Sequence, residues 1–127
     1  MEGKTKVLII EDDKFLSELI STKLKKEGFD ITLATDGETG LKQALSVQPN
    51  IILLDLMLPG IGGFEVLQAL KKNADPAIVN IPVLILSNFG QESKVQEGLA
   101  LGAKDYLVKA NFTTGEIVEK IKSTLGI

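Results

Sequence analysis

The sequence predicts a doubly wound α/β domain, in which helices cover both faces of a five-stranded parallel sheet. Short apolar runs alternate with helix-like segments along the chain, as is typical of buried parallel strands. Glycine and proline fall mostly at the boundaries between these segments. In addition, four of the runs end in a polar or charged residue: Val7–Ile10 before Glu11, Ile51–Leu54 before Asp55, Val83–Leu86 before Ser87, and Tyr106–Val108 before Lys109.

The strands are expected over five segments, of which the second is the most polar and suits an edge of the sheet. In chain order these segments are Lys6–Ile10, Asp30–Ala34, Asn50–Leu54, Pro82–Leu86 and Lys104–Val108. Right-handed crossovers with helices on both faces require the strand order to reverse once. We expect the order 2-1-3-4-5, with the first and third strands flanking the point of reversal.

Helices are expected between the strands and after the last one. They cover Lys14–Glu27, Asp36–Val47, Phe64–Lys72, Gln91–Leu101 and a final segment that starts after Thr113. The first presents Leu16, Leu19, Ile20 and Leu24 on one face and stops at Gly28.

Capping-box patterns mark the start of two helices. Thr35 with Glu38 opens the second helix, and Thr113 with Glu116 opens the last one. The last helix turns Ile117, Val118, Ile121 and Leu125 inward. Two glycines, Gly40 and Gly98, lie inside helices, and each weakens its helix by about 1 kcal/mol relative to alanine.

Length and composition fit a single domain over residues 1–127, with no output domain in this chain. The net charge of -3 argues against direct binding to nucleic acid. No apolar stretch approaches the ~20 residues that span a bilayer, so we expect no membrane insertion. The N-terminal residues 1–6 lack the apolar segment of a signal peptide, and we expect a cytoplasmic protein.

The chain has no cysteine and no histidine. Disulfides, thiolate metal sites, a cysteine nucleophile and a Ser-His-Asp site are therefore excluded. The chain also cannot be the histidine donor of a phosphorelay. Carboxylate, amine and hydroxyl chemistry remains, and clustered carboxylates suit hard cations such as Mg²⁺.

The polar residues at the strand ends should share one pocket, because ligands bind beyond the carboxyl ends of parallel strands. Asp55 is the sharpest signal, since it interrupts an apolar run and a carboxylate there must be paired, metal-bound or reactive. Glu11 and Asp12 on their own would indicate only a solvated loop. Asp13 is predicted to be the N-cap of the first helix. Joined to Asp55, Glu11 and Asp12 make a carboxylate cluster that a divalent ion would relieve.

The other strand-end residues each have an ordinary alternative. Lys109 on its own would be a surface lysine, and Ser87 a strand end or a helix cap. Asn88 with Gln91 offers a competing cap, which leaves Ser87 free for another role. Tyr106 either packs with its hydroxyl reaching water or has a ring that moves when Ser87 is engaged.

In this order the residues resemble the receiver domain of bacterial two-component response regulators. The resemblance covers the whole chain, and it is carried by residues 10–13, by residues 54–60 with Gly63, by Leu86-Ser87 and by Val108-Lys109. It implies a flavodoxin-like (βα)5 fold and a stand-alone, single-domain regulator.

The resemblance also implies the chemistry of the site. Asp55 accepts a phosphoryl group from a histidine kinase or a histidine phosphotransfer protein. Mg²⁺ is held by Glu11 (through water), Asp12, Asp55 and the backbone carbonyl of Met57. Lys109 pairs with the phosphoryl oxygens, Ser87 donates a hydrogen bond to them, and Tyr106 turns inward.

The consequence for signalling is also implied by the resemblance. The surface of the fourth helix, fifth strand and last helix changes its preference for a downstream protein. The resemblance thus implies a signalling phosphoacceptor that assists only its own phosphorylation and dephosphorylation, and not an enzyme acting on other substrates.

This chain departs from the family pattern at two positions. Ala110 follows Lys109, where the family usually has a cis proline. A cis bond before a non-proline residue costs ~3 kcal/mol, so we expect a trans bond and a differently shaped loop. Asn88 follows Ser87, where a smaller residue is usual, and we expect the larger amide to narrow access to Asp55 or to alter the lifetime of the aspartyl phosphate.

Three alternative functions fit the sequence less well than this interpretation. A receiver-like interaction module would share the fold without being phosphorylated at Asp55. An Mg²⁺-dependent aspartyl phosphatase would carry its nucleophile after the first strand, in an Asp-x-Asp order that Glu11-Asp12-Asp13 does not match. A flavin binder would need a hydroxyl-rich phosphate loop where this chain has acids.

Overall fold

A parallel five-stranded sheet forms the centre of the protein. The computed structural model describes residues 4–127, so the first three residues of the predicted 1–127 domain lie outside the described residues. The strand order is β2-β1-β3-β4-β5, as predicted. The strands are β1 (Lys6–Ile10), β2 (Asp30–Ala34), β3 (Ile51–Leu54), β4 (Val83–Ser87) and β5 (Asp105–Val108).

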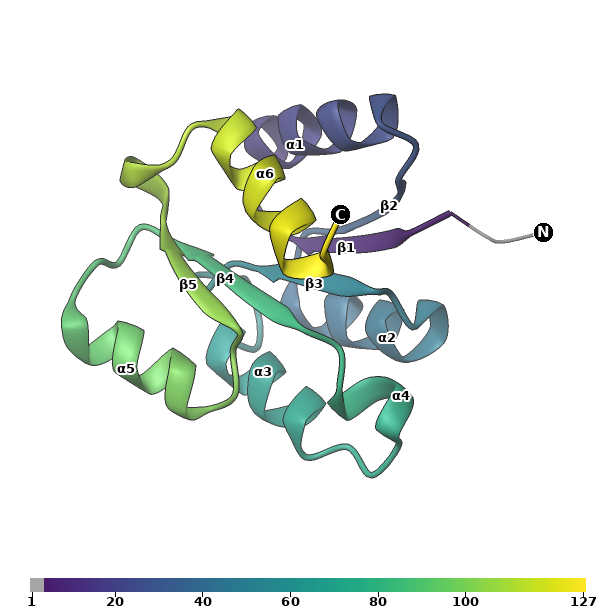
Figure 1. The fold of residues 1–127 in the computed structure, drawn as a ribbon. Helices are drawn as coiled ribbons and strands as arrows, with labels where there is room; N and C mark the ends of the chain where they lie inside the picture. Colours follow the sequence, from purple (N-terminus) through teal and green to yellow (C-terminus); the bar gives the residue numbers. More distant parts are fainter. Residues whose placement is uncertain (1–3) are drawn as a thin grey trace.

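Helices cover both faces of this sheet (Figure 1). They are α1 (Lys14–Lys26), α2 (Gly37–Val47), α3 (Gly63–Lys71), α4 (Pro76–Val79), α5 (Glu92–Ala100) and α6 (Thr114–Leu125), with a 3₁₀ turn η1 (Lys109–Asn111) after β5. One face carries α1 and α6, and the other carries α2, α3, α4 and α5 (Figure 1). The doubly wound fold class is confirmed.

Alternation along the strands divides the core into two clusters. In β1, Val7 and Ile9 pack toward α1 and α6, while Leu8 and Ile10 pack toward α2 and α3. The central strands β1, β3 and β4 are buried on both faces apart from the first residue of β1. Burial on both faces explains why their sequences read as unbroken apolar runs.

The predicted elements match the structure to within one or two residues, with one omission. The strand starts at Asn50, Pro82 and Lys104 and the helix ends at Glu27, Lys72 and Leu101 each lie one residue outside the observed elements. The short helix α4 was not predicted. Asp75 caps it by accepting from the backbone N–H of Ala77 at 2.9 Å, and Pro76 occupies its first position.

The cap of the second helix is a correction. The prediction placed Thr35 at its N-cap, but Asp36 is the N-cap and its carboxylate accepts from the backbone N–H of Thr39 at 2.7 Å. The hydroxyl of Thr39 donates to the same carboxylate at 2.9 Å. The carboxylate of Asp36 thus holds the first turn in place of a Thr35 hydroxyl. In α6, the predicted box of Thr113 and Glu116 is confirmed.

Two details of the helix faces also differ from the prediction. Leu19 was placed on the buried face of α1, but its side chain is 39% exposed. Gly40 and Gly98 were expected only to weaken their helices. A Cβ on Gly40 would lie 2.6 Å from the Cδ1 atom of Ile10, and one on Gly98 would lie 2.6 Å from that of Ile85. Both glycines therefore allow a helix to approach the sheet closely.

None of the helices within residues 4–127 combines the length and apolarity that crossing a membrane would require.

Candidate functional site

The carboxyl edge of the sheet brings together the acids that follow β1 and β3. Ile10 in β1 lies directly beside Leu54 in β3. The residues that follow them, Glu11 and Asp55, are therefore neighbours at the carboxyl ends of the two strands. The backbone N–H of Asp55 donates to the carbonyl of Ile10 at 2.9 Å, which extends the ladder by one more bond. The strand pairing itself therefore fixes how close these two acids lie.

Both carboxylates are buried, and one lysine offsets part of their charge. Glu11 is 2% exposed and Asp55 is 3% exposed. The ammonium nitrogen of Lys109, at the end of β5, lies 3.0 Å from Glu11 Oε1 and 3.3 Å from Asp55 Oδ2, to which it donates a hydrogen bond. When both acids are ionised, two buried carboxylates face one ammonium, which leaves an excess of negative charge.

Backbone N–H groups satisfy part of the remaining hydrogen-bonding capacity. Asp13 N–H donates to Glu11 Oε2 at 3.1 Å, and Met57 N–H donates to Asp55 Oδ1 at 3.2 Å. Glu11 Oε1 has the Lys109 charge nearby but accepts no hydrogen bond of good geometry among the described residues. A buried carboxylate oxygen is thus left for a further partner.

The pKa values reflect this crowding. Burial, followed by the hydrogen-bonding and charge interactions with Asp55, raises the pKa of Glu11 to about 8. Burial works against the charged form of Lys109, but its attraction to Glu11 and Asp55 outweighs that effect and raises its pKa. The ammonium therefore stays charged while the acids compete for it.

The acidic cluster fits a hard divalent cation. Glu11, Asp12 and Asp55 each offer a carboxylate oxygen, and these oxygens lie within 4.8 Å of one another. Asp12 is exposed, so the cluster opens to solvent on one side. Oxygen ligands of this kind suit Mg²⁺, and the unbonded Glu11 oxygen is an acceptor that such an ion would engage directly or through water. The cluster is the predicted set of acids, while the carbonyl of Met57 as a ligand stays a prediction.

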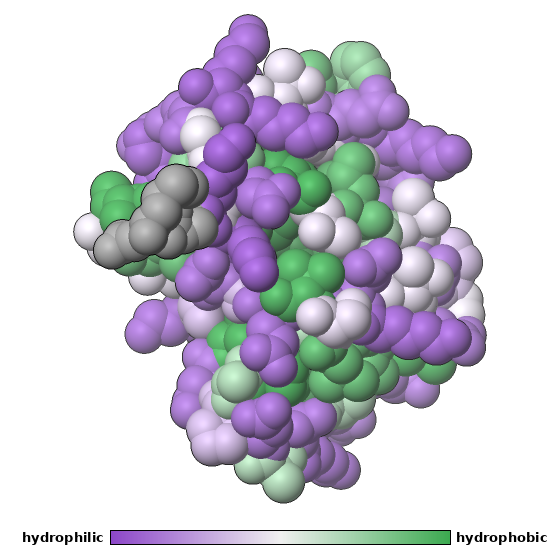
Figure 2. Space-filling view, turned by 90° about the vertical axis from the view of Figure 1, so that its right-hand side faces the viewer, coloured by the Kyte–Doolittle hydropathy of each residue, from purple (hydrophilic) through white to green (hydrophobic). Residues whose placement is uncertain are grey.

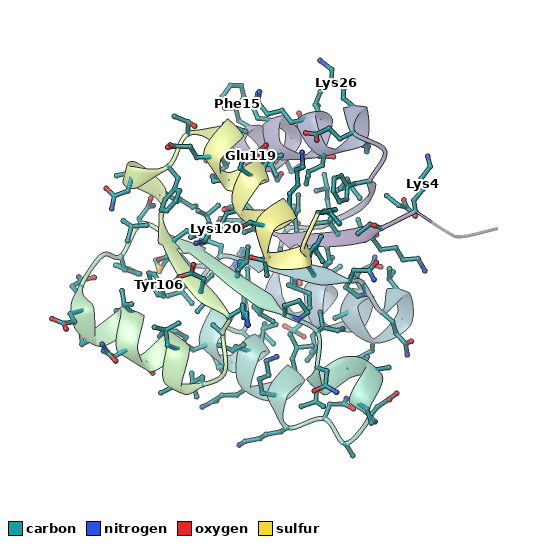
Figure 3. The ribbon with its side chains drawn as sticks, in the orientation of Figure 1. Lys4, Phe15, Lys26, Tyr106, Glu119 and Lys120 are labelled. Atoms are coloured by element: carbon teal, nitrogen blue, oxygen red, sulfur yellow. The ribbon has the colours of Figure 1, made fainter. Side chains whose placement is uncertain are left out.

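Ser87 and Tyr106 are linked through one residue, Phe89. Ser87 is fully buried, and its Oγ accepts from the backbone N–H of Phe89 at 3.0 Å. The Tyr106 hydroxyl donates to the backbone carbonyl of Phe89 at 2.6 Å. Tyr106 is 8% exposed and lies on β5 on the side that faces α5 (Figure 3). Its ring is thus already inward, and its predicted movement with Ser87 stays a prediction.

The two departures from the family pattern leave the lysine in reach of the acids. All peptide bonds within residues 4–127 are trans, and the residues from Lys109 to Asn111 form η1. The trans bond expected before Ala110 is therefore present, and Lys109 still contacts Glu11 and Asp55. Asn88 is exposed at the surface.

Sequence reasoning missed the backbone partners of the site. The backbone N–H of Phe89 donates to Ser87, and the backbone carbonyl of Phe89 accepts from Tyr106. The backbone N–H of Asp13 donates to Glu11, while the Asp13 side chain caps α1. Because every residue type except proline carries both of these groups, no residue signal marks them. The Asp13 N-cap itself is confirmed, with its Oδ1 accepting from Leu16 N–H at 3.1 Å.

Comparisons with known proteins agree on one family. Residues 7–122 match the family described as the response regulator receiver domain. The chain is 40% identical over 120 residues to the DNA-binding dual master transcriptional regulator RpaA of Synechocystis, covering 94% of this chain and 48% of RpaA. The chain therefore spans about half the length of this relative.

Solved structures give the same likeness. The receiver domain of the Francisella response regulator 1452 is 32% identical, with a TM-score of 0.86 and coverage of 97% of this chain and 98% of that one. The Mn²⁺-bound form of response regulator Rcp1 is 31% identical, with a TM-score of 0.78 and coverage of 94% and 92%.

Proposed function

Because this chain belongs to the response regulator receiver domain family, we propose that Asp55 is the residue that accepts its phosphoryl group. The observation that carries the proposal is the burial of Asp55 beside Glu11 and Lys109 at the carboxyl edge of the sheet. A carboxylate in such a place needs a functional reason, since burial of an excess negative charge is unfavourable.

Each side chain has a defined part in the transfer. A carboxylate oxygen of Asp55 attacks the phosphorus of a phosphohistidine, forming a P–O bond while the P–N bond breaks and its electron pair leaves with the imidazole. The Lys109 ammonium, which faces the carboxylates before the transfer, then pairs with the phosphoryl oxygens. Ser87 releases the N–H of Phe89 and donates its hydroxyl hydrogen to a phosphoryl oxygen.

Glu11, Asp12 and Asp55 are the proposed side-chain ligands of Mg²⁺, with the carbonyl of Met57 as a backbone ligand. The spacing of the three acids and the unbonded Glu11 oxygen support this assignment. The Mn²⁺-bound form of Rcp1 supports a divalent ion in a related protein. When bound, such an ion supplies positive charge that offsets the charge of the phosphoryl oxygens.

Proteins of this family interact with histidine kinases or phosphotransfer proteins, which are the proposed phosphodonors. The proposed output surface consists of α5, β5 and α6, where Tyr106 connects β5 to the loop before α5. The relative RpaA is described as DNA-binding, but this chain covers only about half of its length, and we propose no DNA contact by this chain. A cytoplasmic location and the role of phosphoacceptor rather than enzyme also belong to the proposal.

A phosphorylation-independent interaction module is the less favoured alternative. A module that is never phosphorylated would not need the reacting groups of the site. The acids, the hydroxyl and the lysine are all present in this chain, which argues against the alternative.

Intact-protein mass spectrometry tests the proposal directly. The protein is incubated with Mg²⁺ and acetyl phosphate, beside Asp55→Asn and a sample with EDTA. We expect a gain of ~80 Da that requires both Mg²⁺ and Asp55. Asp30→Asn, at the exposed start of β2, is the matched control and should be modified like the wild type.

The outcomes separate the alternatives. No mass gain in a protein that binds Mg²⁺ would favour the interaction module. A gain that persists in Asp55→Asn would place the phosphoacceptor elsewhere.

A further inference from the structure

A polar cavity lies at the amino edge of the sheet, opposite the edge that carries Asp55. Its volume is about 460 Å³, within the usual range of small-ligand sites. Lys71 at the end of α3, Pro82 before β4 and Lys104 before β5 are among the residues that line it, which places it where these strands begin. Figure 2 faces this edge of the molecule and shows hydrophilic residues surrounding apolar ones.

The charge of this cavity is one-sided. Lys71 and Lys104 are among the lining residues, and none of the described residues that line the cavity is an aspartate or a glutamate. Within residues 4–127, neither lysine takes part in any of the ion pairs. The nearby Asp105 is already paired with Lys120 at 2.8 Å. Among the described residues, the ionisable side chains of the lining are thus all basic, which favours an anionic ligand.

A second cavity, between α1 and α6, shows the contrast. It measures about 350 Å³ and is lined by Lys23 and Lys26 but also by Glu27 and Glu119. Its charges balance, so it offers no comparable attraction for an anion. In Figure 3, Lys26 and Glu119 mark this side of the molecule, on α1 and α6.

The ammonium group of Lys71 is held in place before any ligand binds. Its nitrogen donates to the carbonyl of Val79 at 3.1 Å and to that of Ile81 at 2.9 Å. An ammonium has three hydrogens, so one is left for a ligand. Gly102, with φ +108°, lies against the Lys71 stem, because a Cβ there would be 3.1 Å from Lys71 Cγ. This arrangement lowers the ordering cost of binding.

Other lining groups add hydrogen-bonding capacity. Asn80 is an exposed lining residue whose side-chain amide can donate hydrogen bonds. The Thr124 hydroxyl donates to the carbonyl of Lys120 at 2.8 Å, so its oxygen is left to accept. A ligand that combines an oxyanion with a hydroxyl group would complement this lining.

We propose that this amino-edge cavity binds a small organophosphate, with its phosphate group between Lys71 and Lys104. The volume of about 460 Å³ leaves room for an organic group beside the phosphate, and the ligand assigned here is therefore a phosphorylated organic molecule. The site lies at the opposite edge of the sheet from Asp55 and is independent of the proposed phosphoryl transfer. Such a ligand would not compete with Mg²⁺ for the acidic cluster.

A titration followed by ¹H–¹⁵N correlation spectra tests this proposal. The full chain, in EDTA and at constant ionic strength, is titrated separately with glycerol 1-phosphate, inorganic phosphate and glycerol. We expect saturable shifts with glycerol 1-phosphate at the amides of Asn80, Gly102 and Lys104, weaker binding of inorganic phosphate, and no response to glycerol. EDTA keeps a metal-dependent phosphate contact at Asp55 out of the measurement.

Two variants make the test specific. Lys104→Gln removes an exposed charge and should still fold, and we expect it to raise the Kd for glycerol 1-phosphate about tenfold. Lys72→Gln, an exposed neighbour outside the cavity lining, should leave the Kd unchanged.

Several results would overturn the proposal: shifts that do not saturate, equal affinity in Lys104→Gln, an equal response to glycerol, or shifts confined to residues around Asp55. A preference for inorganic phosphate over glycerol 1-phosphate would overturn the organophosphate assignment. The mass assay on Asp55 is read separately, so failure here leaves the proposed phosphoacceptor untouched.

Discussion

Glu11 has the most unfavourable electrostatic surroundings of the acids in the pocket. It is buried, faces Asp55 and shares a single ammonium with it. Its carboxyl group therefore holds a proton more tightly in the folded protein than in the unfolded chain, and its pKa rises to about 8. Burial is the largest cause of this raised pKa, and the neighbouring carboxylate of Asp55, which also belongs to the proposed Mg²⁺ site, adds to it.

The stability of the metal-free protein should therefore depend on pH through Glu11. A raised carboxyl pKa stabilises the fold fully below the unfolded value of 4.5, and this contribution is lost as the pH rises toward about 8. Between about pH 5 and pH 8 we expect the free energy of unfolding in EDTA to fall by roughly 2–4 kcal/mol. Urea unfolding at several pH values measures this fall.

Glu11→Gln provides the comparison for this pH dependence, because it removes the titrating group. The variant should show a flatter profile and greater stability near pH 8. Glu18→Gln, an exposed acid on α1, should keep the wild-type slope. Equal slopes in Glu11→Gln and the wild type would assign the pH dependence to other groups.

Among the elements, α5 is one whose position depends on a missing side chain. Gly98 is buried, and a Cβ there would lie 2.6 Å from Ile85 Cδ1 and 3.2 Å from Tyr106 Cδ2. The helix approaches β4 and β5 closely enough to cover the Tyr106 ring, whose hydroxyl holds the carbonyl of Phe89. Packing of α5 and the inward position of Tyr106 are thus linked.

Gly98→Ala should destabilise the protein although alanine is the better helix former. Overpacking costs about 1–3 kcal/mol, which exceeds the ~1 kcal/mol gained in helix propensity. Gly115→Ala on α6 is the matched control, because the nearest atom to its Cβ would be 3.9 Å away. We expect this control to be neutral or stabilising in thermal unfolding. Equal stabilisation by both substitutions would show that α5 can move away from the sheet without cost.

For the molecule as a whole, stability should be greatest where the sheet is covered on both faces. The strands β1, β3 and β4 lie inside the sheet, whereas β2 is an edge strand with Leu33 40% exposed. Amides of the three inner strands should exchange with deuterium at least about tenfold more slowly than those of β2, because their opening requires both core clusters to separate. Comparable exchange in β2 would indicate a single opening unit that includes the edge.

Patterns along the chain were sufficient for the architecture and for most of the site. Apolar runs, helical periodicity and boundary glycines and prolines identified the sheet and its helices, because these signals are local and repeat with the period of each element. Glu11, Asp12, Asp55 and Lys109 were expected in one pocket because parallel strands present their ends at one edge. The structure confirms that these four residues converge there.

Other features depend on packing and could not be found in the sequence. Phe89 links Ser87 to Tyr106 through its backbone N–H and its backbone carbonyl, so the type of residue at this position does not predict the contact. From the sequence, Gly98 is expected only to destabilise its helix. The structure shows that the absence of a side chain at Gly98 allows α5 to approach the sheet closely. The Lys71 ammonium on α3 donates hydrogen bonds to the backbone carbonyls of residues 79 and 81, and this contact likewise has no signal in the sequence. Local pattern specifies which elements form, while long-range packing sets which backbone atoms they bring into contact.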